Sequence, residues 1–240
     1  MAQPAAPALP PPPPPGSAAS PWSLATWSWS DLVAVTAAPF GVAGMLTIVL
    51  IAAGATSPGW GVLLTVVQQV AFGLGIVWWV RQHDGSARPL GLRAHGTTGR
   101  DIGAGVAAGF GAILASAIVI GITMQVLGRT ELENPLETFG DRWVWVNALF
   151  ALLLAPICEE IAFRGFLFGG LRQRMGFAGA AILSGVVFGA IHGDLVRGPG
   201  LAVTGVILAG VYERRRTLPA SMAAHATVNA VALIGLLGTR

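Results

Sequence analysis

The feature that most constrains the fold is a run from Leu32 to Val80 that contains no Asp, Glu, Lys or Arg. One transmembrane helix needs about 20 predominantly apolar residues, so this run is too long for a single crossing. Thr56-Ser57-Pro58-Gly59 supplies a turn in its middle, which predicts two helices at 32–53 and 60–80. Only 10% of the chain is charged, against about 25% in soluble domains, which favours the membrane class.

Further apolar runs extend this pattern to the C-terminus. We predict helices at 102–128, 143–168, 177–196, 201–212 and 217–237. The predicted fold class is therefore all-α, a multi-pass transmembrane bundle of about seven helices. It follows a disordered Pro- and Ala-rich arm, because Pro10 to Pro15 favour an extended segment that buries no core. The predicted divisions are the arm at 1–28, about three helices with their loops at 29–142, and a core at 143–237.

The basic residues predict topology and no nucleic-acid partner. All 14 are arginines, and they are spread over short loops instead of gathered on one face. With alternating crossings, nine arginines fall on one side, in the loops at 81–101, 165–176 and 213–216, and four fall on the other. Cytoplasmic loops of membrane proteins carry the arginine excess, so we expect a cell-membrane protein with a cytoplasmic N-terminus.

Three charged residues interrupt the fourth predicted helix: Glu159, Glu160 and Arg164. A charge near the bilayer centre costs at least about 2.5–3.5 kcal/mol, so such groups usually face an interior site. Glu160 and Arg164 are four residues apart on one helical face and are expected to pair. Glu159 is rotated by about 100° and is the better candidate for a reactive carboxylate. A purely structural charge cluster is an equal alternative on position alone.

Each of two later predicted helices carries a pair of residues one turn apart that includes a histidine. Phe188 lies one turn before His192, and His225 lies one turn before Asn229. Taken singly, each histidine is more simply a packing residue, and Asn229 could bond a neighbouring helix. Together with Glu159 they supply a base for water, a proton for a leaving amine and donors for an oxyanion. Glu159, His192 and His225 could instead bind a divalent metal that activates the water.

The single cysteine, Cys158, excludes an intramolecular disulfide and a multi-cysteine metal site. Its place beside Glu159 raises a nucleophile hypothesis, but a small buried hydrophobe is the favoured interpretation. A His-Glu-x-x-His metalloprotease motif is absent from the sequence.

Taken in order, the three motifs resemble the signature of the CPBP intramembrane proteases, a group that includes CAAX prenyl endopeptidases and bacteriocin-processing or abortive-infection proteins. The resemblance covers about 143–237 and rests on Glu159-Glu160-x-x-x-Arg164, Phe188-x-x-x-His192 and His225-x-x-x-Asn229. It implies an endopeptidase acting on a membrane-associated protein or peptide, with prenylated CAAX substrates as a family association.

The resemblance also implies roles for the residues. Glu159 and His192 would activate the water, and His225 and Asn229 would stabilise the oxyanion or ligate a metal. Glu160 and Arg164 would complete the site. Two alternatives stay open. In one the site uses no metal, and in the other it binds Zn²⁺ or another divalent ion through Glu159, His192 and His225.

A second class of function also remains open: a non-enzymatic membrane binding, transport or immunity protein that uses the same polar cluster for recognition. The predicted helices also conflict in depth. His192 would lie about 22 Å along its helix from residue 177, whereas Glu160 and His225 would lie about 12 Å from their helix ends. A shared site therefore requires the fifth helix to begin deeper or to tilt.

Overall fold

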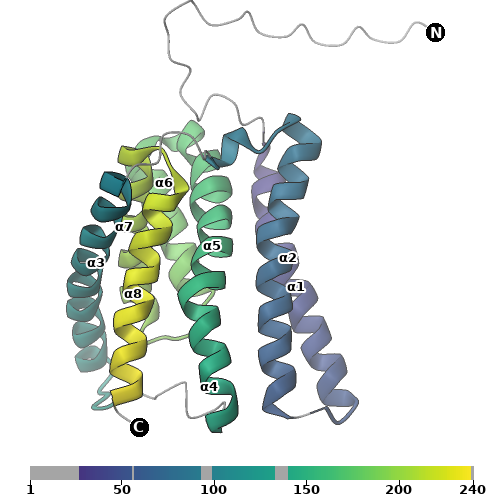
Figure 1. Cartoon of the computed structure of the whole chain (residues 1–240), viewed down its shortest axis with the longest axis vertical. Coiled ribbons are helices and arrows are strands. Elements are labelled where there is room, and N and C mark those ends of the chain that lie inside the picture. The colour runs from purple at the N-terminus through teal and green to yellow at the C-terminus, as the bar shows by residue number, and fades with distance from the viewer. Residues whose placement is uncertain (1–26, 56, 93–98, 133–139, 239–240) are drawn as a thin grey trace, which may run out of the picture.

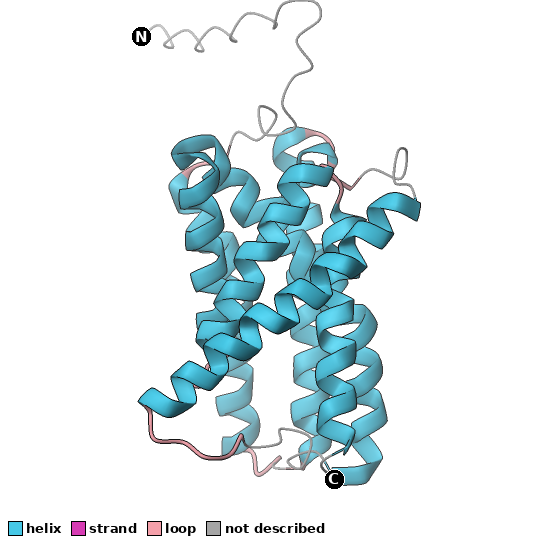
Figure 2. Ribbon diagram, turned by 90° about the vertical axis from the view of Figure 1, so that its left-hand side faces the viewer, coloured by secondary structure: helices cyan, strands magenta, loops and turns pink. Residues whose placement is uncertain are grey.

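A computed structural model describes residues 27–55, 57–92, 99–132 and 140–238, and every regular element in them is a helix (Figure 2). The predicted arm at 1–28 lies almost wholly outside these residues, although Trp27 is described and buried. The α-helices are α1 (Trp29–Ala52), α2 (Pro58–Asp84), α3 (Gly99–Val126), α4 (Gly140–Leu149), α5 (Ala155–Glu160), α6 (Gly169–Ala190), α7 (Gly198–Arg215) and α8 (Leu218–Gly238). The shorter elements are the 3₁₀ turn η2 (Arg88–Leu90) and the π-helical segments η4 (Phe150–Leu154) and η5 (Ile161–Phe168).

Among the described residues, five helical stretches are long and apolar enough to cross a membrane, which confirms the all-α, multi-pass prediction. They are Trp29–Ala52, Gly59–Asp84, Gly99–Val126, Trp143–Ala190 and Leu218–Gly238. The fourth has 48 residues, too many for one crossing, and it is broken at Gly176. Gly176 has φ 72°, a left-handed conformation that glycine adopts without steric cost. The number of about seven helices is thus approximate, since α7 falls outside the five stretches.

The break at Gly176 corrects two predicted boundaries. The fourth helix was expected to end at residue 168, with Arg172 and Arg174 in a loop, but both arginines are helical. Arg172 pairs with Glu213 at 3.2 Å and Arg174 donates to the Gly170 carbonyl at 2.7 Å, so the helix continues past them.

The fifth helix was expected to run to 196, but α6 ends at Ala190 and His192 lies in the following turn. Glu160 and His192 are therefore equally far along the chain from Gly176, which removes the expected mismatch in depth between these two residues.

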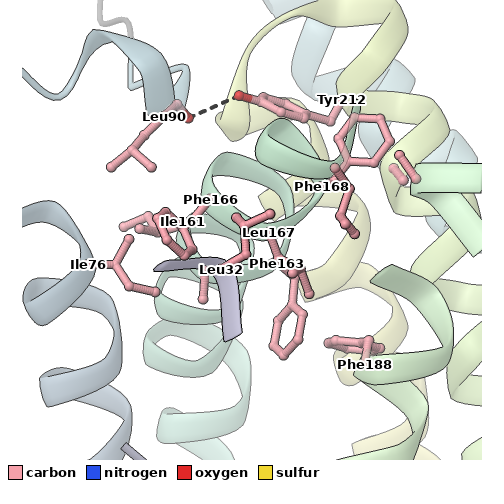
Figure 3. Close-up of a cluster of buried hydrophobic side chains, with 14 of the residues drawn as sticks. Leu32, Ile76, Leu90, Ile161, Phe163, Phe166, Leu167, Phe168, Phe188 and Tyr212 are labelled. Atoms are coloured by element: carbon pink, nitrogen blue, oxygen red, sulfur yellow. Dashed lines mark hydrogen bonds between the residues drawn. The ribbon is translucent and has the colours of Figure 1, made fainter. Parts of the chain in front are cut away.

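Three segments that are distant in sequence meet at the end of the bundle where η2 lies (Figure 1). The Tyr212 hydroxyl donates to the Leu90 carbonyl at 3.0 Å, a bond drawn in Figure 3, and Arg215 pairs with Asp101 at 3.4 Å. Below this end an aromatic cluster fills the space between η5, α6 and α7; its buried rings include Phe163, Phe166, Phe168 and Phe188 (Figure 3). This core fixes the helices that carry the polar residues.

Glycine permits two close helix approaches next to the candidate site. A Cβ atom at Gly109 of α3 would lie 2.7 Å from the carbonyl oxygen of Ala224 in α8, the residue before His225. A Cβ atom at Gly73 of α2 would lie 2.8 Å from Sγ of Cys158, the residue before Glu159. Small residues allow membrane helices to approach closely, so these glycines set the depth at which α8 and α2 meet the site.

Candidate active site

The carboxylate pair lies in an irregular part of the long helical stretch Trp143–Ala190. Glu159 and Glu160 end the short α5, which stands between the π-helical segments η4 and η5. Such π-helical turns occur frequently at functional sites. Both side chains are buried, Glu160 completely and Glu159 with 7% exposed. Two buried carboxylates require partners, and the structure supplies them from other helices.

Glu160 is the centre of a buried charged cluster. Its Oε1 atom lies 3.1 Å from Nη1 of Arg164, forming the predicted i,i+4 ion pair. The same oxygen accepts a hydrogen bond of 3.0 Å from Nδ1 of His225 in α8. Glu160 therefore neutralises the buried guanidinium and fixes the orientation of an imidazole on a helix that lies far away in the sequence.

Arg164 connects this cluster to two more helices. Its Nη2 atom donates to the Gly205 carbonyl of α7 at 3.4 Å. Its guanidinium also lies over the ring of Phe188 from α6, 4.7 Å from the ring centroid. An arginine that is 1% exposed is thus held by a carboxylate, a carbonyl and an aromatic face.

The two oxygens of Glu159 have different surroundings. Oε1 accepts a 2.5 Å hydrogen bond from Nε2 of Gln69 in α2. Oε2 is buried and has no hydrogen-bond partner among the described residues. The nearest basic group to Oε2 is Nε2 of His225, at 3.8 Å, which is beyond hydrogen-bond range. A buried carboxylate oxygen without a partner is costly unless a water or a ligand occupies the space beside it.

His192 occupies the exposed turn after α6, where its Nδ1 donates to the Phe188 carbonyl at 2.7 Å. A carbonyl can only accept, so Nδ1 carries the proton and Nε2 of the neutral ring has a free lone pair. The Phe188 ring contacts both imidazoles, with centroids 5.0 Å from His192 and 5.6 Å from His225.

Asp194 closes the turn that carries His192. Its Oδ1 atom accepts from the amides of Val196 and Arg197, each at 2.8 Å, and its Oδ2 atom pairs with the Arg197 guanidinium. Burial opposes ionisation of Asp194, but the hydrogen bonds from Arg197 and Val196 outweigh it and lower the pKa of this carboxyl below its ordinary value. The turn is therefore held by an ionised aspartate at neutral pH.

Asn229 reaches the fourth helix instead of the other polar groups. Its Nδ2 atom donates to the Ala151 carbonyl at 2.8 Å. In η4 the bonding runs from residue i to i+5, as the amide of Ala155 bonds the Phe150 carbonyl. The next such partner would be residue 156, a proline without an N–H, so the Ala151 carbonyl is left for Asn229.

A cavity of about 340 Å³ joins these groups. Its lining combines four of the six predicted site residues with polar side chains of α2 and α7; the polar residues are Thr65, Gln68, Gln69, Glu159, His192, Thr204, His225 and Asn229. A water occupies about 30 Å³ in the liquid, so the cavity has room for water and a short peptide segment. Glu160 and Arg164 stand behind it as supports.

The predicted residues therefore meet in part. Glu159, Glu160, Arg164 and His225 form one contact network, whereas His192 and Asn229 share the cavity without a recorded bond to that network. Sequence reasoning missed Gln69. Its signal was present, because Gln68-Gln69 places two consecutive amides within an otherwise apolar span.

The predicted metal set is not assembled in this arrangement. Across residues 27–55, 57–92, 99–132 and 140–238, no three His, Cys, Asp or Glu side chains converge closely enough to hold a metal ion. The role of Glu159, His192 and His225 as metal ligands therefore stays a prediction.

Comparison with known proteins bears on the same segment. Residues 141–231 match the family described as type II CAAX prenyl endopeptidase Rce1-like. Residues 141–231, called the CPBP segment below, are thus similar to that family, which supports the resemblance to the CPBP intramembrane proteases. The match agrees with the family predicted from the three motifs, and the CPBP segment contains every predicted site residue.

One known protein supports the same resemblance. The chain is 28% identical over 131 residues to the "Putative membrane peptidase YdiL" of Bacillus subtilis (strain 168). The alignment covers 54% of each protein, so the chain spans about half the length of the curated relative it matches. No solved structure gives a significant match.

Proposed function

We propose that the protein is an intramembrane endopeptidase that hydrolyses a peptide bond with a water activated by Glu159. The observation that carries the proposal is the buried, unpartnered Oε2 atom of Glu159, a residue that lines a cavity of about 340 Å³. A buried carboxylate with a free lone pair beside a water-sized space is what a general base needs.

In the proposed reaction, a water beside Glu159 transfers a proton to Oε2 while its oxygen attacks the peptide carbonyl. The resulting tetrahedral intermediate collapses as the protonated Glu159 returns the proton to the leaving amine, so each proton and bond is accounted for. The lone pair on Nε2 of His192 would orient the water. Donors from His225 and Asn229 would stabilise the developing oxyanion.

Glu160 and Arg164 would act through other residues. Glu160 holds Nδ1 of His225, which aims the opposite nitrogen, Nε2, toward Glu159. A proton on this Nε2 would leave Glu159, Glu160, Arg164 and His225 with no net charge, which favours a buried cluster. For the substrate we propose a membrane-associated protein or peptide, with prenylated CAAX-type chains as the first class to test because of the family description.

The test is peptide cleavage by purified protein in liposomes, with product masses recorded for prenylated and unprenylated peptides. Glu159→Gln keeps the shape and removes the base, so we expect cleavage to fall at least about 100-fold. Glu131→Gln, in an exposed loop, is the control and should cleave normally. Undiminished cleavage by Glu159→Gln would refute the base, and peptide binding without any cleavage by the wild type would favour a recognition protein.

A further inference from the structure

Gln69 lines the cavity and contacts Glu159, but it belongs to none of the three sequence motifs. It lies on α2, outside the CPBP segment at 141–231, yet its amide donates to Oε1 of Glu159. Its neighbour Gln68 also lines the cavity, but no hydrogen bond between Gln68 and Glu159 is recorded. The two glutamines carry the same amide on the same helix, and Gln69 is the one that bonds Glu159.

We propose that Gln69 is a positioning residue that aims the Glu159 carboxylate at the attacking water. The inference rests on the proposed function, because aim matters only if Glu159 is the base. It also extends the reaction centre beyond the CPBP segment, since α2 then supplies a side chain on which the chemistry depends.

The need for such a residue follows from the torsion of a glutamate. The last side-chain torsion of Glu is broad and nearly free, so an unheld carboxylate samples many orientations. The Gln69 bond occupies Oε1, which leaves Oε2 as the oxygen without a hydrogen-bond partner among the described residues. Reactions between positioned groups lose up to about 100-fold when one group is misplaced by about 1 Å.

The surroundings of Glu159 leave this task to Gln69. The ionisable groups near it are Glu160 and Arg164 on its own helix, His225 on α8 and His192 after α6. Arg164 is engaged by Glu160, and His225 stays 3.8 Å from Oε2. Within the described residues, Gln69 is the hydrogen-bond donor recorded for the Glu159 side chain. Removing it should therefore free the carboxylate without removing a charge.

The kinetic test compares Gln69→Met with Gln82→Met, since methionine matches the unbranched shape of glutamine and lacks the amide. Gln82 is an exposed residue of the same helix and does not line the cavity. We expect kcat of Gln69→Met to fall roughly 10- to 100-fold while KM changes less than about twofold, the pattern of an interaction that acts in the transition state. Gln82→Met should keep the wild-type kcat. Equal kcat values for the two variants would overturn the proposal.

A second measurement separates this inference from the proposed function. The infrared antisymmetric stretch of the Glu159 carboxylate can be assigned by its loss in Glu159→Gln. We expect this band to shift in Gln69→Met and to stay in place in Gln82→Met, in folded protein without substrate. An unshifted band in Gln69→Met overturns the positioning role whatever the activity, whereas wild-type cleavage no faster than Glu159→Gln overturns the proposed function itself.

Discussion

The side-chain amide of Asn229 donates a hydrogen bond to the backbone carbonyl of Ala151 at 2.8 Å. The carbonyl is available because Pro156 stands where η4 would place its amide partner. One polar residue of α8 thus satisfies a backbone defect in the fourth helix while it lines the cavity. The Asn229 side chain therefore stabilises the fold, and in the proposed reaction it also donates to the oxyanion.

Asn229→Ala should destabilise the protein by about 1–3 kcal/mol in the free energy of unfolding, because it leaves a carbonyl without a partner away from water. In a Pro156→Ala background the loss should shrink, since the amide of residue 156 can then reach Ala151. Unfolding in mixed micelles measures both. Asn147→Ala is the control, because the Asn147 amide bonds a carbonyl of its own helix. Equal losses in both backgrounds would contradict the account.

Arg164→Met should cost about 3–5 kcal/mol of unfolding free energy, because Glu160 is left as a buried charge without its guanidinium partner. Adding Glu160→Gln to Arg164→Met should recover part of this loss. Arg215→Met removes an ion pair whose arginine is 40% exposed, and its cost should stay below about 1 kcal/mol. A double variant less stable than Arg164→Met would show that Glu160 is not the charge that Arg164 balances.

The sequence could predict what local helix geometry determines. Glu160 and Arg164 pair as expected because i,i+4 neighbours meet on any helix. The contact between Glu160 and His225 depends on how α8 packs against α3, where Gly109 admits the Ala224 carbonyl, and no spacing along the chain records that. Gln69 escaped because uncharged amides do not break an apolar run.

The error at the fifth helix has a related cause. Arg172 and Arg174 were assigned to a loop because charges commonly end apolar runs. Glu213, from the far end of α7, pairs with Arg172 and lets the helix continue to Gly176. The partner of a charge lies in the tertiary structure, so a charge in the sequence marks a boundary only when it has no such partner.

Gly73→Ala should lower kcat, because the new methyl group would lie 2.8 Å from Sγ of Cys158 and would push α2, with Gln69, away from Glu159. The fall should reach about 10-fold if the displacement approaches 1 Å. Gly75→Ala on the same helix meets no atom within 4 Å and should cleave at the wild-type rate. Equal rates for the two alanine variants in the peptide assay would argue against a close α2 contact.

Chelation should leave cleavage unchanged. A catalytic zinc ion needs three protein ligands at about 2 Å. One oxygen of Glu159 is hydrogen-bonded to Gln69, and within the described residues His192 forms no hydrogen bond or ion pair with Glu159 or His225. The measurement is peptide cleavage with and without 1,10-phenanthroline, together with metal analysis of the purified protein. Loss of cleavage that Zn²⁺ restores would instead assign Glu159, His192 and His225 as ligands.

A reporter fused after Arg240 should lie outside the cytoplasm. The arginine-rich segments at 81–101, 165–176 and 213–216 contact one another at one end of the bundle, through the pairs Arg172–Glu213 and Arg215–Asp101 (Figure 1). The C-terminus lies at the opposite end in the same view. Because arginine-rich loops stay in the cytoplasm, alkaline phosphatase at the C-terminus should be active, and the same enzyme inserted within 81–101 should be inactive. The reverse pattern would turn the bundle over and would place its arginine-rich end outside the cell.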